Sequence, residues 1–78
     1  MDYTENDLPV TLAEAEMVTL ADGTQVRFEE SGGARDVFVG DEWTARATLF
    51  PGSTYVLEVS GGQYTLEAEA TTLRVTKN

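Results

Sequence analysis

Carboxylates are the most abundant side chains in this sequence that could act in catalysis or bind a ligand. The 78 residues include 14 aspartates and glutamates, and they include no histidine and no cysteine. The usual general base, the imidazole metal ligand and the thiol nucleophile are therefore absent. Paired carboxylates can do acid–base work, but they need a pocket that shifts their pKa. Here the acids fall at outward strand positions and in turns, so we expect no enzyme activity.

Metal ions and phosphates have no recognisable motif in this sequence. Calcium needs six or more oxygen ligands from a close loop, and the EF-hand spacing is absent. The glycine pairs of "SGGA" and "SGGQ" lack the lysine and the following helix of a phosphate-binding loop. The three serines (Ser31, Ser53 and Ser60) lie in Gly-rich turns that explain them structurally. We therefore predict no cofactor and no resident metal.

Acidic residues that share one face occur in the stretch "VLEVSGGQYTLEAEA", residues 56–70. Its Gly-Gly pair is typical of a two-residue hairpin loop, which would pair Ser60 with Gln63. In that register the apolar side chains point inward, and three carboxylates lie on the solvent face: Glu58, Glu67 and Glu69. Alternate strand residues are about 6.6–6.8 Å apart, so such a row roughly tracks every second phosphate of a DNA strand. The face is a candidate mimic of nucleic acid.

Four further acids complete the candidate protein-binding residues. Asp41 and Glu42 lie at the turn of another predicted hairpin, and Glu29 and Glu30 begin a flexible Gly-rich connection. The net charge is −9, and the only lysine is Lys77. Such a field repels nucleic acid and anionic membranes and favours a basic partner surface. In size and acidity the chain resembles phage anti-defence proteins that inhibit CRISPR effectors or restriction enzymes, although no motif assigns it to a family.

Successive hairpins must position these acids. The stretch "MVTLADGTQVRF" predicts a hairpin whose three-residue loop, Ala21-Asp22-Gly23, pairs Val18 with Val26. The stretch "DVFVGDEWTARATLF" predicts another, which turns at Gly40-Asp41 and places Phe38 opposite Trp43. These two aromatic residues share the predicted inward phase with three others: Phe28, Tyr55 and Tyr64. Three valines fall outward and indicate a second packed layer or an edge that pairs with another copy: Val37, Val39 and Val56.

The C-terminal third contains two further corners. Pro51-Gly52 predicts a type II turn, because proline presets its φ and glycine accepts a positive φ. After Ala70 the apolar phase changes, which indicates a bulge or corner at Thr71-Thr72. A final strand over residues 73–76 could then cross to another sheet.

The N-terminal region is read as a loose acidic lead-in over residues 1–9, followed by a single antiparallel β domain over residues 10–78. Within "TLAEAEM", Thr11 and Glu14 form a capping-box pattern that favours a short helix near residues 11–17. A strand from Leu8 to Leu20 fits the same segment, and both alternatives stay open. The sequence as a whole predicts an all-β fold, a small antiparallel barrel or sandwich of six to seven short strands built from consecutive hairpins.

These features favour a small acidic binding or inhibitor protein that occupies a basic, nucleic-acid-binding surface of a partner protein. The alternative is a structural or assembly module, such as a phage particle component or a halophile-type acidic domain, whose charge serves solubility. Exposed strand edges also allow a homo-oligomer. No apolar run approaches a membrane span or a secretory signal, so we expect a soluble cytoplasmic protein.

Overall fold

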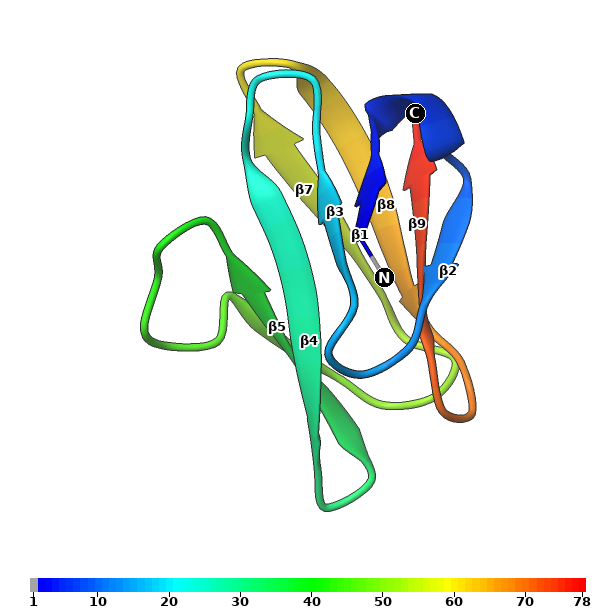
Figure 1. Ribbon diagram of the computed structural model, residues 1–78. Helices are drawn as coiled ribbons and strands as arrows, with labels where there is room; N and C mark the ends of the chain where they lie inside the picture. The colour runs from blue at the N-terminus through cyan, green and yellow to red at the C-terminus, as the bar shows by residue number, and fades with distance from the viewer. Residues whose placement is uncertain (1) are drawn as a thin grey trace.

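Two β-sheets make up nearly all of the computed structural model, which describes residues 2–78 (Figure 1). The strand order is β1-β3-β4-β5-β6 in the five-stranded sheet and β2-β9-β8-β7 in the four-stranded sheet. The described elements are β1 (Asp2–Thr4), the 3-10 turn η1 (Glu5–Asp7), β2 (Val10–Leu12), β3 (Met17–Thr19), β4 (Gln25–Ser31), β5 (Ala34–Val39), β6 (Ala47–Leu49), β7 (Thr54–Val59), β8 (Gly62–Ala68) and β9 (Leu73–Lys77). The all-β prediction is confirmed, with nine short strands in the described chain where six or seven were expected.

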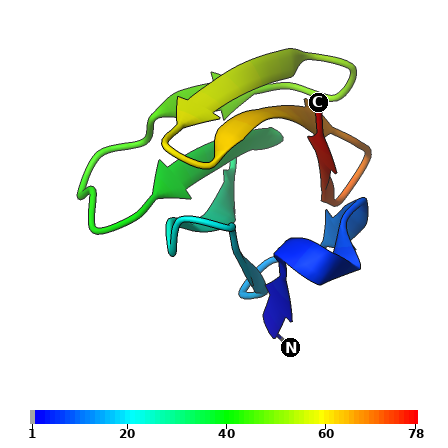
Figure 2. The same cartoon turned by 90° about the horizontal axis from the view of Figure 1, so that it is seen from above.

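The core lies between the two sheets, which curve around a shared interior when seen from above (Figure 2). Alternate residues of each strand point inward, as strand geometry requires. The five-stranded sheet contributes mainly valines and one phenylalanine: Val18, Val26, Phe28, Val37 and Val39. The four-stranded sheet contributes mainly leucines and one tyrosine: Leu12, Leu57, Tyr64, Leu66, Leu73 and Val75. The inward phase predicted for the hairpin over residues 56–70 is confirmed by these residues.

Two turns have the form that the sequence predicts. In the β3–β4 hairpin Val18 pairs with Val26, and the Gly23 N–H donates to the Leu20 carbonyl at 2.9 Å, with φ +89° at Gly23. Between β6 and β7 the Ser53 N–H donates to the Phe50 carbonyl at 2.8 Å, and Gly52 has φ +92°. A positive φ is cheap only for glycine, so these residues determine the turn types locally.

The β7–β8 hairpin turns one residue earlier than predicted, which shifts the cross-strand pairing by two residues. Val59 pairs with Gly62, so Ser60 and Gly61 form the loop, and the predicted Ser60–Gln63 pair is wrong. A shift of two leaves every side chain on its predicted face. The tip of this hairpin closely approaches the β3–β4 turn, since a Cβ on Gly61 would lie 3.3 Å from the Cβ of Ala21. These two turns lie side by side in Figure 1.

The predicted flexible connection after residue 28 is a tight hairpin instead. β4 continues through Ser31, which pairs with Ala34, and Gly32 and Gly33 form the turn with φ of +59° and +84°. Two successive positive φ angles are typical of a two-residue hairpin loop whose twist matches the strands. The hairpin places Val37 opposite Phe28.

This register reverses the predicted faces of β5. Val37 and Val39 are buried, so their predicted outward orientation is wrong, whereas Val56 is half-exposed as predicted. Phe38 lies on the outer face, where it pairs across the strands with Arg27. The predicted inward Phe38–Trp43 pair is also wrong, because Trp43 lies in the β5–β6 loop with 96% of its surface exposed.

The N-terminal residues from Asp2 onward are part of the fold, and the prediction of a loose lead-in is wrong for them. β1 pairs in parallel with β3, from Asp2 opposite Met17 to Thr4 opposite Thr19. Glu5 then makes three long-range contacts at the top of the molecule. Its carboxylate accepts hydrogen bonds from the Tyr64 hydroxyl at 2.8 Å and the Ala21 N–H at 3.0 Å, and it pairs with Lys77 at 2.8 Å.

Neither alternative for residues 8–20 is correct. β2 pairs with β9 in one sheet and β3 pairs with β4 in the other. A turn at Glu14 and Ala15 separates them, with φ +75° at Ala15, so the chain can form neither a helix nor one continuous strand. The Ala13 N–H donates to the Glu16 carboxylate at 2.8 Å across this turn.

The final strand stays in the sheet of its predecessor. β9 pairs with β8 from Tyr64 opposite Lys77 to Ala68 opposite Leu73, so the predicted crossing to another sheet is wrong. The change of apolar phase reflects a four-residue loop, in which the Glu69 N–H donates to the Thr72 carbonyl at 2.9 Å.

Candidate functional site

The β5–β6 loop, residues 40–46, holds the most exposed large apolar side chain of the described residues. Trp43 is 96% exposed, although backbone hydrogen bonds hold both ends of the loop. The Gly40 N–H donates to the Gln25 carbonyl at 2.7 Å, and the Arg46 N–H donates to the Val37 carbonyl at 2.7 Å. The loop therefore presents the indole to solvent from a supported base. Exposed tryptophans of this kind are enriched among the residues that dominate protein–protein binding.

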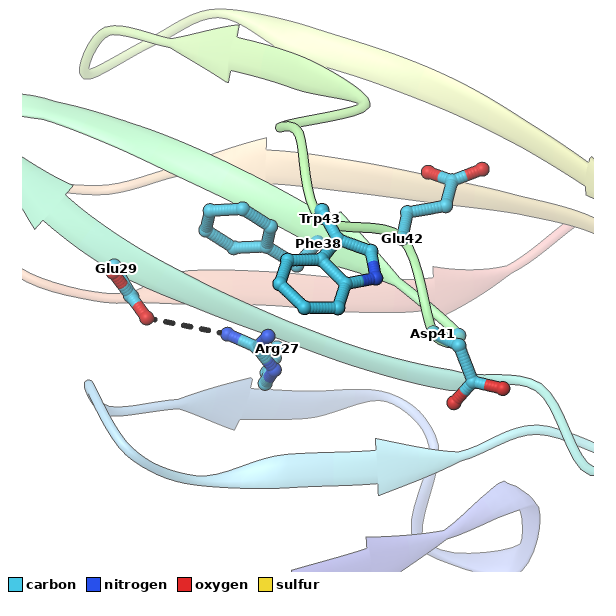
Figure 3. Close-up of a pocket in the computed structure, with 7 residues that line it drawn as sticks. Arg27, Glu29, Phe38, Asp41, Glu42 and Trp43 are labelled. Carbon is cyan, nitrogen blue, oxygen red and sulfur yellow. Dashed lines mark hydrogen bonds and ion pairs between the residues drawn. The ribbon is translucent and has the colours of Figure 1, made fainter.

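An open hollow of about 560 Å³ lies between this loop and the outer face of the five-stranded sheet. Its lining includes Arg27 and Glu29 from β4, Phe38 from β5, and Asp41, Glu42 and Trp43 from the loop, and Figure 3 shows the carboxylates of Asp41 and Glu42 directed away from the other labelled side chains. We call the surface formed by these six residues the Trp43 face. A second hollow, beside Glu14 and Ala15, also has Arg27 and Glu29 in its lining. The concave surface thus extends across β4 to the β2–β3 turn.

Within the Trp43 face, Arg27 is held by an aromatic ring and a carboxylate. Its guanidinium carbon lies 4.6 Å from the centroid of the Phe38 ring, and one guanidinium nitrogen lies 3.3 Å from the Glu29 carboxylate. Strand alternation explains the arrangement, because Arg27 and Glu29 are two residues apart on β4 and Arg27 is paired with Phe38 on β5. Both charged side chains are about half exposed, so this ion pair contributes little to stability.

The two acids of the β5–β6 loop differ in their contacts. Glu42 accepts hydrogen bonds from two nitrogens of Arg46, and this contact holds the pKa of Glu42 below its usual value. Asp41 is exposed and makes no hydrogen bond or ion pair with another residue in the described part of the chain. Asp41 is therefore the loop carboxylate that is available to an incoming cation.

The structure brings together three of the seven candidate binding residues and separates the others from them. Asp41, Glu42 and Glu29 belong to the Trp43 face. Glu30 is exposed further along β4, where its N–H donates to the Glu14 carboxylate at 3.0 Å. The other three (Glu58, Glu67 and Glu69) belong to the four-stranded sheet and the loop that follows it.

Those three glutamates do not form the continuous row that the sequence predicts. Glu58 pairs with Gln63, which is four residues from Glu67 on β8, a separation of about 13 Å along the strand. Glu67 lies opposite Arg74 of β9, whose positive charge offsets its own. Glu69 lies in the β8–β9 loop and accepts a hydrogen bond from the Thr72 hydroxyl at 3.2 Å. This correction follows from the two-residue shift in the β7–β8 pairing.

Sequence reasoning missed three members of the site: Arg27, Phe38 and Trp43. The available signal was the first glycine pair of the chain, Gly32-Gly33, because a two-residue loop there places Val37 opposite Phe28 and turns Phe38 outward. The described residues contain no cluster of acidic side chains that could hold a metal ion, and none of their elements is a helix that could span a membrane. Comparisons with protein-family models, curated proteins and solved structures find no significant match.

Proposed function

We propose that this chain is a non-enzymatic protein-binding domain that docks onto a basic surface of a partner through the Trp43 face. The observation that carries the proposal is the exposure of Trp43 beside an open hollow. An indole left in water by folding is available for burial in a complex, and a few such anchors supply most of the energy of an interface.

Charge supports a basic partner. The net charge is −9, and Asp41 lines the hollow beside Trp43 as a carboxylate without a partner in the described chain, whereas Glu29 and Glu42 are paired with Arg27 and Arg46. Opposite charges around an apolar anchor steer encounter and determine which partners are accepted. Basic grooves that bind nucleic acid are one class of such surface, so a small inhibitor of a nucleic-acid-binding protein is consistent with this chemistry. Mimicry of a phosphate row has less support, because Glu67 is opposed by Arg74.

Binding to protamine, an arginine-rich DNA-binding protein, tests the proposal. We expect Trp43→Ala to weaken binding by about tenfold or more at both low and high salt, because the lost contact is apolar. The matched control is Phe50→Ala, which removes another exposed aromatic side chain outside the Trp43 face. If the two variants bind alike, net charge alone accounts for the interaction and the proposal is wrong.

A second candidate function is self-assembly, and one observation favours it. Val56 is half-exposed on β7, which is one of the two edge strands of the four-stranded sheet. An apolar edge strand is a template for pairing with another copy. Sedimentation velocity over a range of protein concentrations should then reveal a dimer that Val56→Thr returns to a monomer. A wild-type chain that stays monomeric throughout the range excludes this candidate.

A further inference from the structure

We infer that the group received by the Trp43 face is the guanidinium of a partner arginine, which stacks on the Trp43 ring and pairs with Asp41. This inference rests on the proposed function and names the chemistry of the partner. It starts from a contact that the chain makes with itself, because the Trp43 face already holds one guanidinium.

Arg27 is the internal example of the contact. Its guanidinium lies over the Phe38 ring at 4.6 Å and beside the Glu29 carboxylate at 3.3 Å. An aromatic ring attracts the cation through its negative face, and a carboxylate neutralises the charge at the edge. Arg46, in the β5–β6 loop, is held by a carboxylate without such a ring, since two of its nitrogens donate to Glu42. Two guanidinium groups are thus bound within or next to this face.

Trp43 and Asp41 likewise provide an aromatic ring and a carboxylate, and neither is in contact with a cation in the described chain. Trp43 is 96% exposed, and Asp41 has no hydrogen bond or ion pair within the described chain. The two residues are two positions apart in the loop, and both line the hollow. Tryptophan is the strongest cation–π acceptor among the side chains, so the indole of Trp43 should attract a cation more strongly than the Phe38 ring that already holds Arg27.

Arginine fits this arrangement better than lysine does. A guanidinium is planar, so it can stack on the indole and still direct a fork of N–H donors toward a carboxylate. It is also more weakly hydrated than an ammonium group and loses less solvation when an aromatic ring covers it. Lysine offers a point charge that gains mainly from the general field of the acidic protein.

The fluorescence of Trp43, the only tryptophan in the chain, reports directly on this site. The probes are three blocked tripeptides of arginine, of lysine and of citrulline, which resembles arginine in shape but is uncharged. We expect saturable quenching by tri-arginine, affinity at least about threefold weaker for tri-lysine, and no saturation with tri-citrulline. Equal affinities for the arginine and lysine peptides would overturn the inference, as would unchanged fluorescence with all three.

Charge-matched variants complete the test. Asp41→Asn should weaken tri-arginine binding several-fold more than Asp2→Asn, which removes the same charge from the exposed end of β1. Arg27→Ala should tighten binding because it uncovers Phe38 and Glu29, whereas Arg74→Ala makes the same charge change on the other sheet and should do so less. If the two variants within each matched pair change the affinity for tri-arginine equally, only net charge matters and the inference fails. Loss of protamine binding by Trp43→Ala without arginine selectivity would refute this inference alone and leave the proposed function standing.

Discussion

Replacing Trp43 with alanine should separate binding from folding. Because Trp43 is 96% exposed, folding covers only about 4% of a side chain that can bury about 150–250 Å². That is at most about 10 Å², which at about 25 cal/mol per Å² amounts to about 0.3 kcal/mol. A tryptophan in the core would instead cost about 3–5 kcal/mol on truncation. The expected change in the free energy of unfolding is therefore close to zero.

The assay is urea unfolding followed by far-UV circular dichroism, since the variant has no tryptophan to report by fluorescence. Phe28→Ala provides the contrast, because Phe28 is 1% exposed and its truncation should cost about 3–5 kcal/mol, a large part of the stability of so small a domain. A loss of about 2 kcal/mol or more in Trp43→Ala would refute the reasoning, since only an indole packed on the sheet could produce it.

The same variant should lose binding. If a partner covers the whole indole, roughly 150–250 Å² becomes buried, which corresponds to about 4–6 kcal/mol before the costs of association are subtracted. Tryptophan anchors typically cost at least about 2 kcal/mol when truncated, or about thirtyfold in affinity. A variant that is as stable as the wild type and binds protamine equally well would show that Trp43 is not an anchor.

Three other predictions concern the contacts that hold the sandwich together. The contact with Lys77 is the main reason that the pKa of Glu5 lies below its usual 4.5. The ionised carboxylate therefore stabilises the fold fully above pH 4.5, and this stabilisation is lost as the pH falls through the lower pKa of the folded state. Urea midpoints of the wild type and Glu5→Gln should converge toward acid pH, and a constant gap between them would contradict this. Arg35→Met should cost about 1–3 kcal/mol in urea unfolding, because the buried guanidinium of Arg35 donates to backbone carbonyls at the base of the sandwich; an unchanged midpoint would argue against that role. Gly33→Ala should cost about 1–2 kcal/mol at φ +84°, whereas Gly32→Asn at φ +59° should be almost neutral, and equal thermal midpoints for the two variants would count against a tight turn.

Several features of the fold follow from the sequence alone because they depend on neighbouring residues. Gly23 and Gly52 determine their turns, since a positive φ is a property of one residue and its flanks. Alternation of apolar and polar residues predicted that Leu57, Tyr64 and Leu66 point inward. This prediction is correct although their pairing shifts by two residues, because a shift of two leaves each side chain on the same face. Of the seven acids that charge and composition singled out, three line the same hollow, and their role in binding stays a prediction.

Tertiary contacts decided what local pattern left open. The parallel pairing of β1 with β3 and the contacts of Glu5 join residues that are distant in sequence, so no local signal distinguished them from a loose segment. The close approach of Gly61 to Ala21 likewise joins hairpin tips that are distant in sequence, and the pairing of β7 with β8 sets the spacing of Glu58 and Glu67. Trp43 was predicted to be core because Phe38 was taken as inward; the local Gly32-Gly33 hairpin could have corrected Phe38, whereas the exposure of Trp43 depends on which parts of the fold cover the β5–β6 loop. An indole is apolar in any register, and only the assembled sheet determines whether a neighbouring strand covers it or the solvent does.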